Sequence, residues 1–183
     1  MNCEEIRVDM RDMTPEDLQE AERQTHLLHL LNHTEPRTKE YQQILQDLFK
    51  KNLGANSYVT APLAGAALDH VTIGRNVFIN SNCLLMARGG ITIEDNVMIA
   101  ANTQIISNNH DLYDRQVLLC KPVLIREGAW IGAGATILPG ICVGKNAVVG
   151  AASVVIEDVP DYAVVVGNPA QVLRTLDPDG FHE

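Results

Sequence analysis

Large aliphatic residues recur at every sixth position along much of the chain. The series comprises Ile73, Ile79, Leu85, Ile93, Ile99, Ile105, Ile125, Ile131, Ile137, Val143, Val149 and Val155. An interval of six matches neither the helical period of about 3.6 residues nor the alternation of a plain strand, so it describes a larger repeating unit. The pattern therefore predicts a solenoid whose aliphatic residues stack in ladders down its middle.

The residues between these positions indicate the shape of each unit. Three positions after the aliphatic residue stand Asn and Gly, which adopt a left-handed backbone at little cost: Asn76, Asn82, Asn96, Asn102, Asn108, Gly128, Gly134, Gly140 and Asn146. The next position holds small or β-branched residues: Val77, Cys83, Val97, Thr103, Ala129, Ala135, Ile141, Ala147 and Ser153. Each unit is therefore expected to be a short strand followed by a corner. Three units, roughly eighteen residues, would complete one turn of a triangular coil.

Residues 1–54 have the helical period instead. Thr14, Pro15 and Asp17 are typical of an N-cap, a first-turn proline and a first-turn acid, and they predict a helix from residue 15 to about residue 31. Its apolar side would consist of Leu18, Ala21, Thr25, Leu28 and Leu31. A second amphipathic helix after Pro36 carries Tyr41, Ile44, Leu45, Leu48 and Phe49. We expect both helices to cover the open end of the coil, whose last turn has unpaired edges, and they could also share in a substrate site.

These patterns divide the chain into three consecutive parts. We expect a helical segment (1–54), a coil (55–160) with an inserted loop (107–122), and a tail (161–183) that folds back on the coil. Residues 55–72 are expected to be an irregular start of the coil, with Ala61 and Ala67 in register. A slip of two residues at 88–93 indicates an enlarged corner, and Pro160 is expected to end the coil because it cannot continue a strand ladder.

Composition restricts the classes of partner. With 46% hydrophobic residues the chain can form a substantial core, and its net charge of −9, without a local basic cluster, argues against nucleic acid or an anionic membrane as the main partner. The four cysteines, Cys3, Cys83, Cys120 and Cys142, have no paired spacing, which favours reduced thiols. The acidic start is unlike a signal peptide, and no apolar run is long enough to cross a membrane. We therefore expect a cytoplasmic protein.

His110 stands near the start of the inserted loop. Loops on rigid scaffolds often carry function, and imidazole is the side chain best suited to take a hydroxyl proton near neutral pH. The residues alone leave open that His110 is an ordinary loop residue.

Several motifs together carry a resemblance to a known family. They are Asn109-His110, residues 122–125 (PVLI), 130–140 (WIGAGATILPG), 150–155 (GAASVV) and 167–170 (GNPA). With them nearly the whole chain resembles the hexapeptide-repeat acyltransferases, in particular the galactoside and maltose O-acetyltransferases. The resemblance implies a mainly β fold, a left-handed parallel β-helix with an N-terminal helical cap. It also implies a homotrimer with active sites at the subunit seams, and acetyl transfer from acetyl-CoA to a hydroxyl of a sugar or other small acceptor.

The same resemblance implies roles for individual residues. His110 matches the catalytic histidine, a general base for direct transfer without a covalent intermediate, and the backbone amide of Ala133 matches the donor to the developing oxyanion. The family has proline after this histidine and a longer loop, whereas Asp111 follows here. These differences leave the base in place and the identity of the acceptor open.

The resemblance places the acceptor among Asp12, Ala66, Asn80 and Arg88. Asp12 and Asn80 agree with the family and could orient hydroxyls, although each could equally be a solvated surface residue. Ala66 stands where the family has serine, and Arg88 where it has aspartate. A fixed positive charge at this position suggests an acceptor that carries an anionic group.

Acetyl-CoA is expected in a groove between two coils. The resemblance places its pantetheine arm beside Trp130 and the backbones of Ala133 and Ala151; the corresponding alternatives are a tryptophan in a subunit contact and small residues that serve only corners. The phosphate contacts of the family, a Thr-Lys pair and two arginines, correspond to Ile156, Glu157, Gln171 and Arg174. Only Arg174 matches, so we expect a weaker or different grip on the phosphates.

Two rival functions remain. A carbonic anhydrase on the same coil holds a metal with three histidines, whereas this coil offers only His70 and His110. His26, His29 and His33 lie in the helical segment without a Cys or acid partner, so no metal is expected. The second rival is a coil that serves as a non-catalytic scaffold.

Overall fold

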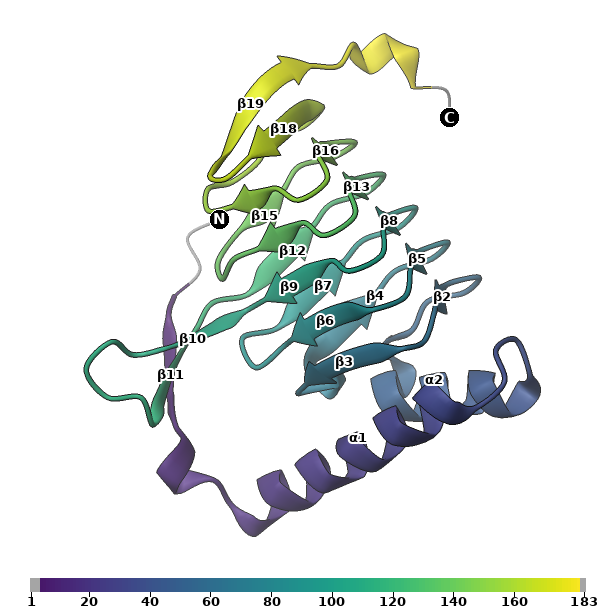
Figure 1. Cartoon of the computed structure of the whole chain (residues 1–183), viewed down its shortest axis with the longest axis vertical. Helices are drawn as coiled ribbons and strands as arrows, with labels where there is room; N and C mark the ends of the chain where they lie inside the picture. Colours follow the sequence, from purple (N-terminus) through teal and green to yellow (C-terminus); the bar gives the residue numbers. More distant parts are fainter. Residues whose placement is uncertain (1–3, 182–183) are drawn as a thin grey trace.

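A computed structural model describes residues 4–181 as a triangular coil closed at one end by helices (Figure 1). Strands stack on three faces, and all of them are parallel except β19. The first face holds β4 (Val71–Ile73), β7 (Ile91–Ile93), β12 (Val123–Ile125) and β15 (Cys142–Val143). The second holds β2 (Tyr58–Val59), β5 (Phe78–Ile79), β8 (Met98–Ile99), β13 (Trp130–Ile131), β16 (Val148–Val149), β18 (Ala163–Gly167) and β19 (Ala170–Thr175). The third holds β3 (Leu63–Ala66), β6 (Cys83–Met86), β9 (Gln104–Ile106), β14 (Thr136–Ile137) and β17 (Val154–Val155). The predicted fold, a mainly β parallel β-helix with a helical cap, is confirmed.

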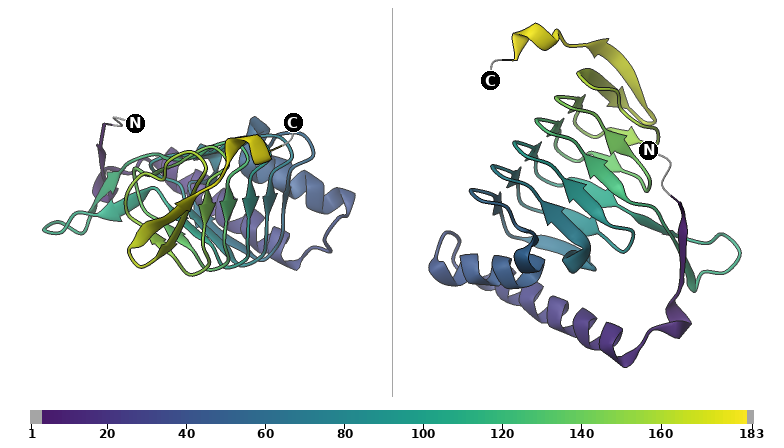
Figure 2. Two further views of the ribbon diagram at one scale, coloured as in Figure 1. Left: turned by 90° about the horizontal axis from the view of Figure 1, so that it is seen from above. Right: turned by 180° about the vertical axis from the view of Figure 1, so that it is seen from behind.

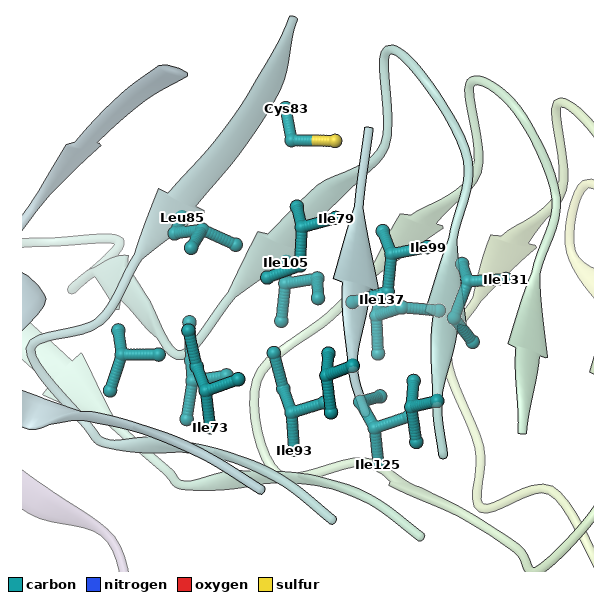
Figure 3. Close-up of a cluster of buried hydrophobic side chains, with 14 of the residues drawn as sticks. Ile73, Ile79, Cys83, Leu85, Ile93, Ile99, Ile105, Ile125, Ile131 and Ile137 are labelled. Carbon is teal, nitrogen blue, oxygen red and sulfur yellow. The ribbon is translucent and has the colours of Figure 1, made fainter. Parts of the chain in front are cut away.

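The predicted ladders form the core (Figure 3). Every aliphatic position of the series, from Ile73 to Val155, is at most 2% exposed. The left-handed corners are also confirmed, with positive φ at Asn76, Asn82, Asn96, Asn102, Asn146, Gly128, Gly134 and Gly140. Asn108 is the exception, because the chain leaves the coil there and Asn108 begins a strand, β10 (Asn108–His110). Its prediction as a corner was wrong.

The first turn keeps the spacing of six up to Gly65 and then has an enlarged corner that contains the short helix η3 (Leu68–His70), so the expectation of an irregular start was only partly right. Leu53, Val59 and Gly65 pair with Ile73, Ile79 and Leu85, so they occupy the aliphatic register, and Ala61 and Ala67 do not. Residue 65 lacks a side chain to fill the core there. Leu68, fully buried in the short helix η3 (Leu68–His70), reaches to 2.9 Å from the position a Cβ of Gly65 would take, and so supplies that bulk.

Two helices cover the open end below this turn. Helix α1 (Pro15–His33) begins at Thr14 with a capping box to Asp17, and α2 (Lys39–Phe49) buries its predicted apolar side. The predicted side of α1 was partly wrong. Leu18, Ala21 and Thr25 are exposed; Leu31 is buried as predicted, and Gln24, which was not predicted, is buried as well. The remaining short helices are η1 (Met10–Asp12), η2 (Lys50–Asn52) and η4 (Pro178–Gly180).

Polar side chains of the helices bond to the backbone of the first turn. The Tyr41 hydroxyl accepts from the Ala61 amide at 2.7 Å and donates to the Val59 carbonyl at 2.9 Å. Asn32 bonds both the amide and the carbonyl of Leu63, each at 2.9 Å. A solenoid has no further turn to pair with these groups, so the helices satisfy hydrogen bonds as well as covering apolar surface.

Replacing Tyr41 with phenylalanine tests this capping. The substitution keeps the buried ring and leaves the Ala61 amide and the Val59 carbonyl without their partner. Loss of a buried hydrogen-bond partner costs about 1–3 kcal/mol, so the free energy of unfolding should fall by that amount in urea denaturation. The exposed Tyr113, changed to phenylalanine, is the matched control. Equal stability of both variants would contradict the capping role.

The sheets continue beyond Pro160. Val159 bridges to Val143, and β18 adds a parallel strand to the second face beside β16. Strand β19 then turns back antiparallel along β18. Among residues 4–181 no helix is both long enough and apolar enough to span a membrane.

Candidate active site

The inserted loop is an ordered β-hairpin. Strand β10 pairs antiparallel with β11 (Val117–Cys120), and the N-terminal strand β1 (Ile6–Asp9) pairs with the other side of β11. Figures 1 and 2 show this three-stranded sheet projecting from one edge of the coil. We call this edge, between the third and first faces, the hairpin edge. Neither the hairpin nor β1 was predicted from the sequence.

His110 ends β10 with an exposed side chain. Its Nδ1 lies 2.6 Å from the carbonyl oxygen of Arg115. A carbonyl can only accept, so Nδ1 carries the hydrogen and Nε2 of the neutral ring keeps its lone pair. That lone pair is the group that a general base requires.

The turn next to His110 is held by its own hydrogen bonds. Asp111 Oδ1 accepts from the backbone amides of Tyr113 at 2.8 Å and Asp114 at 3.2 Å, and Oδ2 accepts from Arg7 at 2.8 Å. These bonds, first that from the Tyr113 amide and then that from Arg7, lower the pKa of Asp111 to about 2. Asp111 is therefore a carboxylate at any working pH.

Arg88 lies at the root of the hairpin. The corner of the coil that carries Arg88 is held by Ser107. The Ser107 hydroxyl accepts from the Gly89 amide at 2.9 Å and donates to the Met86 carbonyl at 2.8 Å. Arg88 is half-buried and makes no hydrogen bond or ion pair with any residue in the range 4–181. The pKa of Asp17 is lowered mainly by hydrogen bonds from Thr14 and additionally by the charge of Arg88, so the start of α1 is within electrostatic reach.

Other predicted residues share this edge. Asp12 is exposed at the end of η1, which links β1 to α1. Ala66 is exposed at the end of β3 and pairs with Met86 of β6, just before Arg88. Ile156 and Glu157 follow β17, the last strand of the third face, and are exposed there. Glu157 also lines a cavity of about 60 Å³ with Gln171 of β19.

Asn80, Ala133 and Ala151 lie on a different edge. They occupy three of the corners between the second and third faces, residues 80–82, 132–134 and 150–152, with the corner 100–102 between the first two; we call this edge the small-residue edge. Asn80 Oδ1 accepts from the Ser81 amide at 2.7 Å, which leaves its NH₂ group as a donor. Ala133 and Ala151 are exposed, and within residues 4–181 their backbone amides make no hydrogen bond.

Trp130 and Arg174 lie on the second face beside this edge. Strand register places Arg174 opposite Val164, then Val148, then Trp130. Three strand spacings of about 4.8 Å put Arg174 roughly 14 Å from Trp130. The column continues through Met98 and Phe78, and Phe78, Met98 and Trp130 are 42%, 53% and 49% exposed. A single chain therefore presents an exposed apolar ladder that ends in a cation.

The predicted site residues thus separate into two groups. Asp12, Arg88, His110, Ile156 and Glu157 lie on or beside the hairpin edge, and Asn80, Trp130, Ala133, Ala151 and Arg174 lie on the small-residue edge or the second face. One chain does not bring the two groups together. Among the described residues no group of three His, Cys, Asp or Glu side chains could hold a metal ion.

Comparison with known proteins agrees with this architecture. Residues 122–157 match the family model described as bacterial transferase hexapeptide, and residues 70–106 match that of the hexapeptide repeat of succinyl-transferase. The galactoside O-acetyltransferase of Escherichia coli K12 is 30% identical over 160 residues, which cover 85% of this chain and 79% of that protein.

Two solved structures are similar over nearly the whole chain. A maltose O-acetyltransferase from Clostridium difficile superposes with a TM-score of 0.85 at 34% identity, covering 90% of each chain. A hexapeptide-repeat-containing acetyltransferase from Vibrio cholerae, complexed with acetyl coenzyme A, also gives a TM-score of 0.85, at 33% identity over 90% of this chain and 91% of that one. By sequence and by structure, the chain belongs to the hexapeptide-repeat acetyltransferases.

Proposed function

We propose that this protein transfers an acetyl group from acetyl-CoA to a hydroxyl of a sugar or other small acceptor, with His110 as the general base. The observation that carries the proposal is the bond from His110 Nδ1 to the Arg115 carbonyl, which leaves Nε2 free at the exposed end of a strand. Similarity to a structure that holds acetyl coenzyme A supports the choice of donor.

The proposed reaction has one addition and one elimination. His110 Nε2 takes the proton of the acceptor hydroxyl while the hydroxyl oxygen attacks the thioester carbon. The tetrahedral oxyanion accepts a hydrogen bond from the Ala133 amide. The carbon–sulfur bond then breaks, the imidazolium returns the proton to the thiolate, and free coenzyme A leaves. A thioester is already activated, so no covalent enzyme intermediate is needed.

We further propose that the active site forms between two copies of the chain in a homotrimer. His110 and the Ala133 amide lie on different edges of one coil, so they can serve one reaction only if a neighbouring copy places its small-residue edge beside the hairpin. The exposed ladder of Phe78, Met98 and Trp130 offers apolar surface for such a contact.

The cofactor would follow the second face and the small-residue edge. Trp130 provides apolar surface for the pantetheine arm, and the Ala151 amide is a donor for one of its carbonyl groups, while the Ala133 amide serves the thioester oxygen; neither amide makes a hydrogen bond within residues 4–181. Arg174 makes no ion pair within residues 4–181 and is available for a phosphate. Ile156 and Glu157 add no positive charge, so we propose that the phosphates are held less firmly than in relatives with more cations.

The acceptor would lie between the two edges. Asp12 and the NH₂ group of Asn80 are suited to hydroxyl groups, and Arg88 is suited to an anionic substituent because its guanidinium is half-buried without a partner among the described residues. We therefore propose an acceptor that carries both a hydroxyl and a negative charge.

The acceptor preference and the activity can be tested together. Coenzyme A release from acetyl-CoA is followed with methyl glucoside and with methyl glucuronide, which differ by one carboxylate. The wild type should prefer the glucuronide. Arg88→Met should reduce the ratio of kcat/KM for the glucuronide to kcat/KM for the glucoside by about 10- to 100-fold, which corresponds to the loss of a hydrogen bond to a charged group. Arg88→Lys, which keeps the charge, is the control. An unchanged ratio in Arg88→Met argues against an anionic acceptor, and absence of turnover with any hydroxyl acceptor argues against the function.

We also propose a cytoplasmic location. Cys83, Cys120 and Cys142 are free thiols, as is usual in reducing compartments, and burial raises the pKa of Cys83. Cys3 lies outside the described residues.

A further inference from the structure

Two arginines of the N-terminal segment bind the turn of the hairpin. We call β1 and η1 together the strap. Arg7 Nη2 donates to Asp111 Oδ2 at 2.8 Å, and Arg11 Nη2 donates to Asp114 Oδ2 at 2.7 Å. Backbone pairing of β1 with β11 continues through the bond from the Met10 amide to the Gln116 carbonyl at 2.8 Å. The strap therefore holds the turn from one side at two carboxylates and along a whole strand.

The same turn leads directly to the imidazole. Asp111, held by Arg7, accepts from the Tyr113 and Asp114 amides. The Arg115 guanidinium closes the turn by donating to the Asp111 carbonyl at 2.6 Å, and the Arg115 carbonyl accepts from His110 Nδ1 at 2.6 Å. Arg7 is thus bonded to Asp111, and hydrogen bonds within residues 110–115 connect Asp111 to the carbonyl that holds the ring.

We propose that Arg7 and Asp111 are positioning residues for His110: the strap fixes the turn so that the Arg115 carbonyl holds the ring in its Nδ1–H form. The proposal rests on the proposed role of His110 as the base. The Arg7 side chain is 57% exposed and the Asp111 side chain 15%. An ion pair with so exposed a guanidinium contributes little to stability, so a purely stabilising role explains the contact poorly. Orientation has a larger effect, since a displacement of about 1 Å can cost about 100-fold in rate.

Arg7→Ala is the direct test. We expect kcat to fall about tenfold, with the KM for acetyl-CoA and the Tm nearly unchanged, because Trp130 and Ala133 lie on another edge. Asp111→Asn should cause a similar loss, and the double variant should be no worse than either single one. The control is Arg75→Ala, which removes an exposed ion pair with Asp95 at another corner, 2.6 Å long in the wild type, and should leave kcat unchanged.

A second measurement follows the tautomer of the His110 ring. The ¹⁵N chemical shifts of neutral His110 should show one tautomer, Nδ1–H, in the wild type and in Arg75→Ala, and a mixture of both tautomers in Arg7→Ala. Wild-type kcat and a single tautomer in Arg7→Ala would overturn the positioning role, as would a loss of activity equal to that of Arg75→Ala. The His110→Ala variant keeps the two proposals apart. If it is inactive while Arg7→Ala is normal, only the role of the strap fails; if it is active, the role of His110 as base fails.

Discussion

Replacing His110 with alanine is expected to lower kcat for acetyl transfer by about 10²- to 10⁴-fold, the usual contribution of a positioned general base. The substitution removes the only group that the proposed mechanism uses to take the hydroxyl proton. It removes little else, because the side chain is exposed and, within residues 4–181, bonds only to the Arg115 carbonyl. Folding and cofactor binding should therefore persist.

The measurement combines steady-state rates with titration of coenzyme A by calorimetry. The dissociation constant of coenzyme A should stay within about threefold of the wild-type value, since the proposed cofactor contacts lie on other residues. His70→Ala is the control, because His70 is also an exposed histidine of the coil. A variant that keeps most of its kcat, or one whose loss is matched by His70→Ala, would assign proton transfer to another group.

The coil could be predicted because its determinants are local and repeated. Each aliphatic residue meets its counterpart one turn away, as Ile93 meets Ile73 and Ile125, so the same spacing places every one of them inside. Asn and Gly at the corners indicate directly that the backbone there adopts a left-handed conformation. Such a pattern fixes burial without knowledge of distant contacts.

The first turn lacked that pattern. Gly65 stands at an aliphatic position, and its space is filled by Leu68 from an enlarged corner. Gln24 is buried in α1 because its side chain accepts from the Leu68 amide, a polar contact that a search for apolar periodicity cannot find. For these reasons the predicted aliphatic register of the first turn and the predicted buried side of α1 were wrong.

The surroundings of His110 could be predicted least. The strap meets the hairpin through exposed side chains far apart in sequence, as in the pair of Arg7 and Asp111, and β1 is too short and too exposed to show a clear period. The resemblance to the family pointed to His110, whereas the carbonyl of Arg115 that orients it became visible only in the folded hairpin. The resemblance implied a site at the subunit seams, whereas the distribution of its residues over two edges of one coil became visible only in the fold.

The central claim is that one site takes His110 from one chain and the small-residue edge from another. Two defective variants test it: His110→Ala lacks the base, and Ala151→Phe places a ring at the exposed corner where pantetheine is expected to lie. Each variant alone should be nearly inactive. Co-refolding equal amounts should restore about a quarter of the wild-type activity, because random assembly pairs an intact hairpin with an intact small-residue edge at about one seam in four.

The decisive measurement is the specific activity of that mixture, with the two variants refolded separately and then combined as the control. Recovery to about a quarter of the wild-type rate, only after co-refolding, is the predicted result. A mixture no more active than the sum of its two components would contradict the account, because it would mean that each chain completes its site alone or that these residues do not share one.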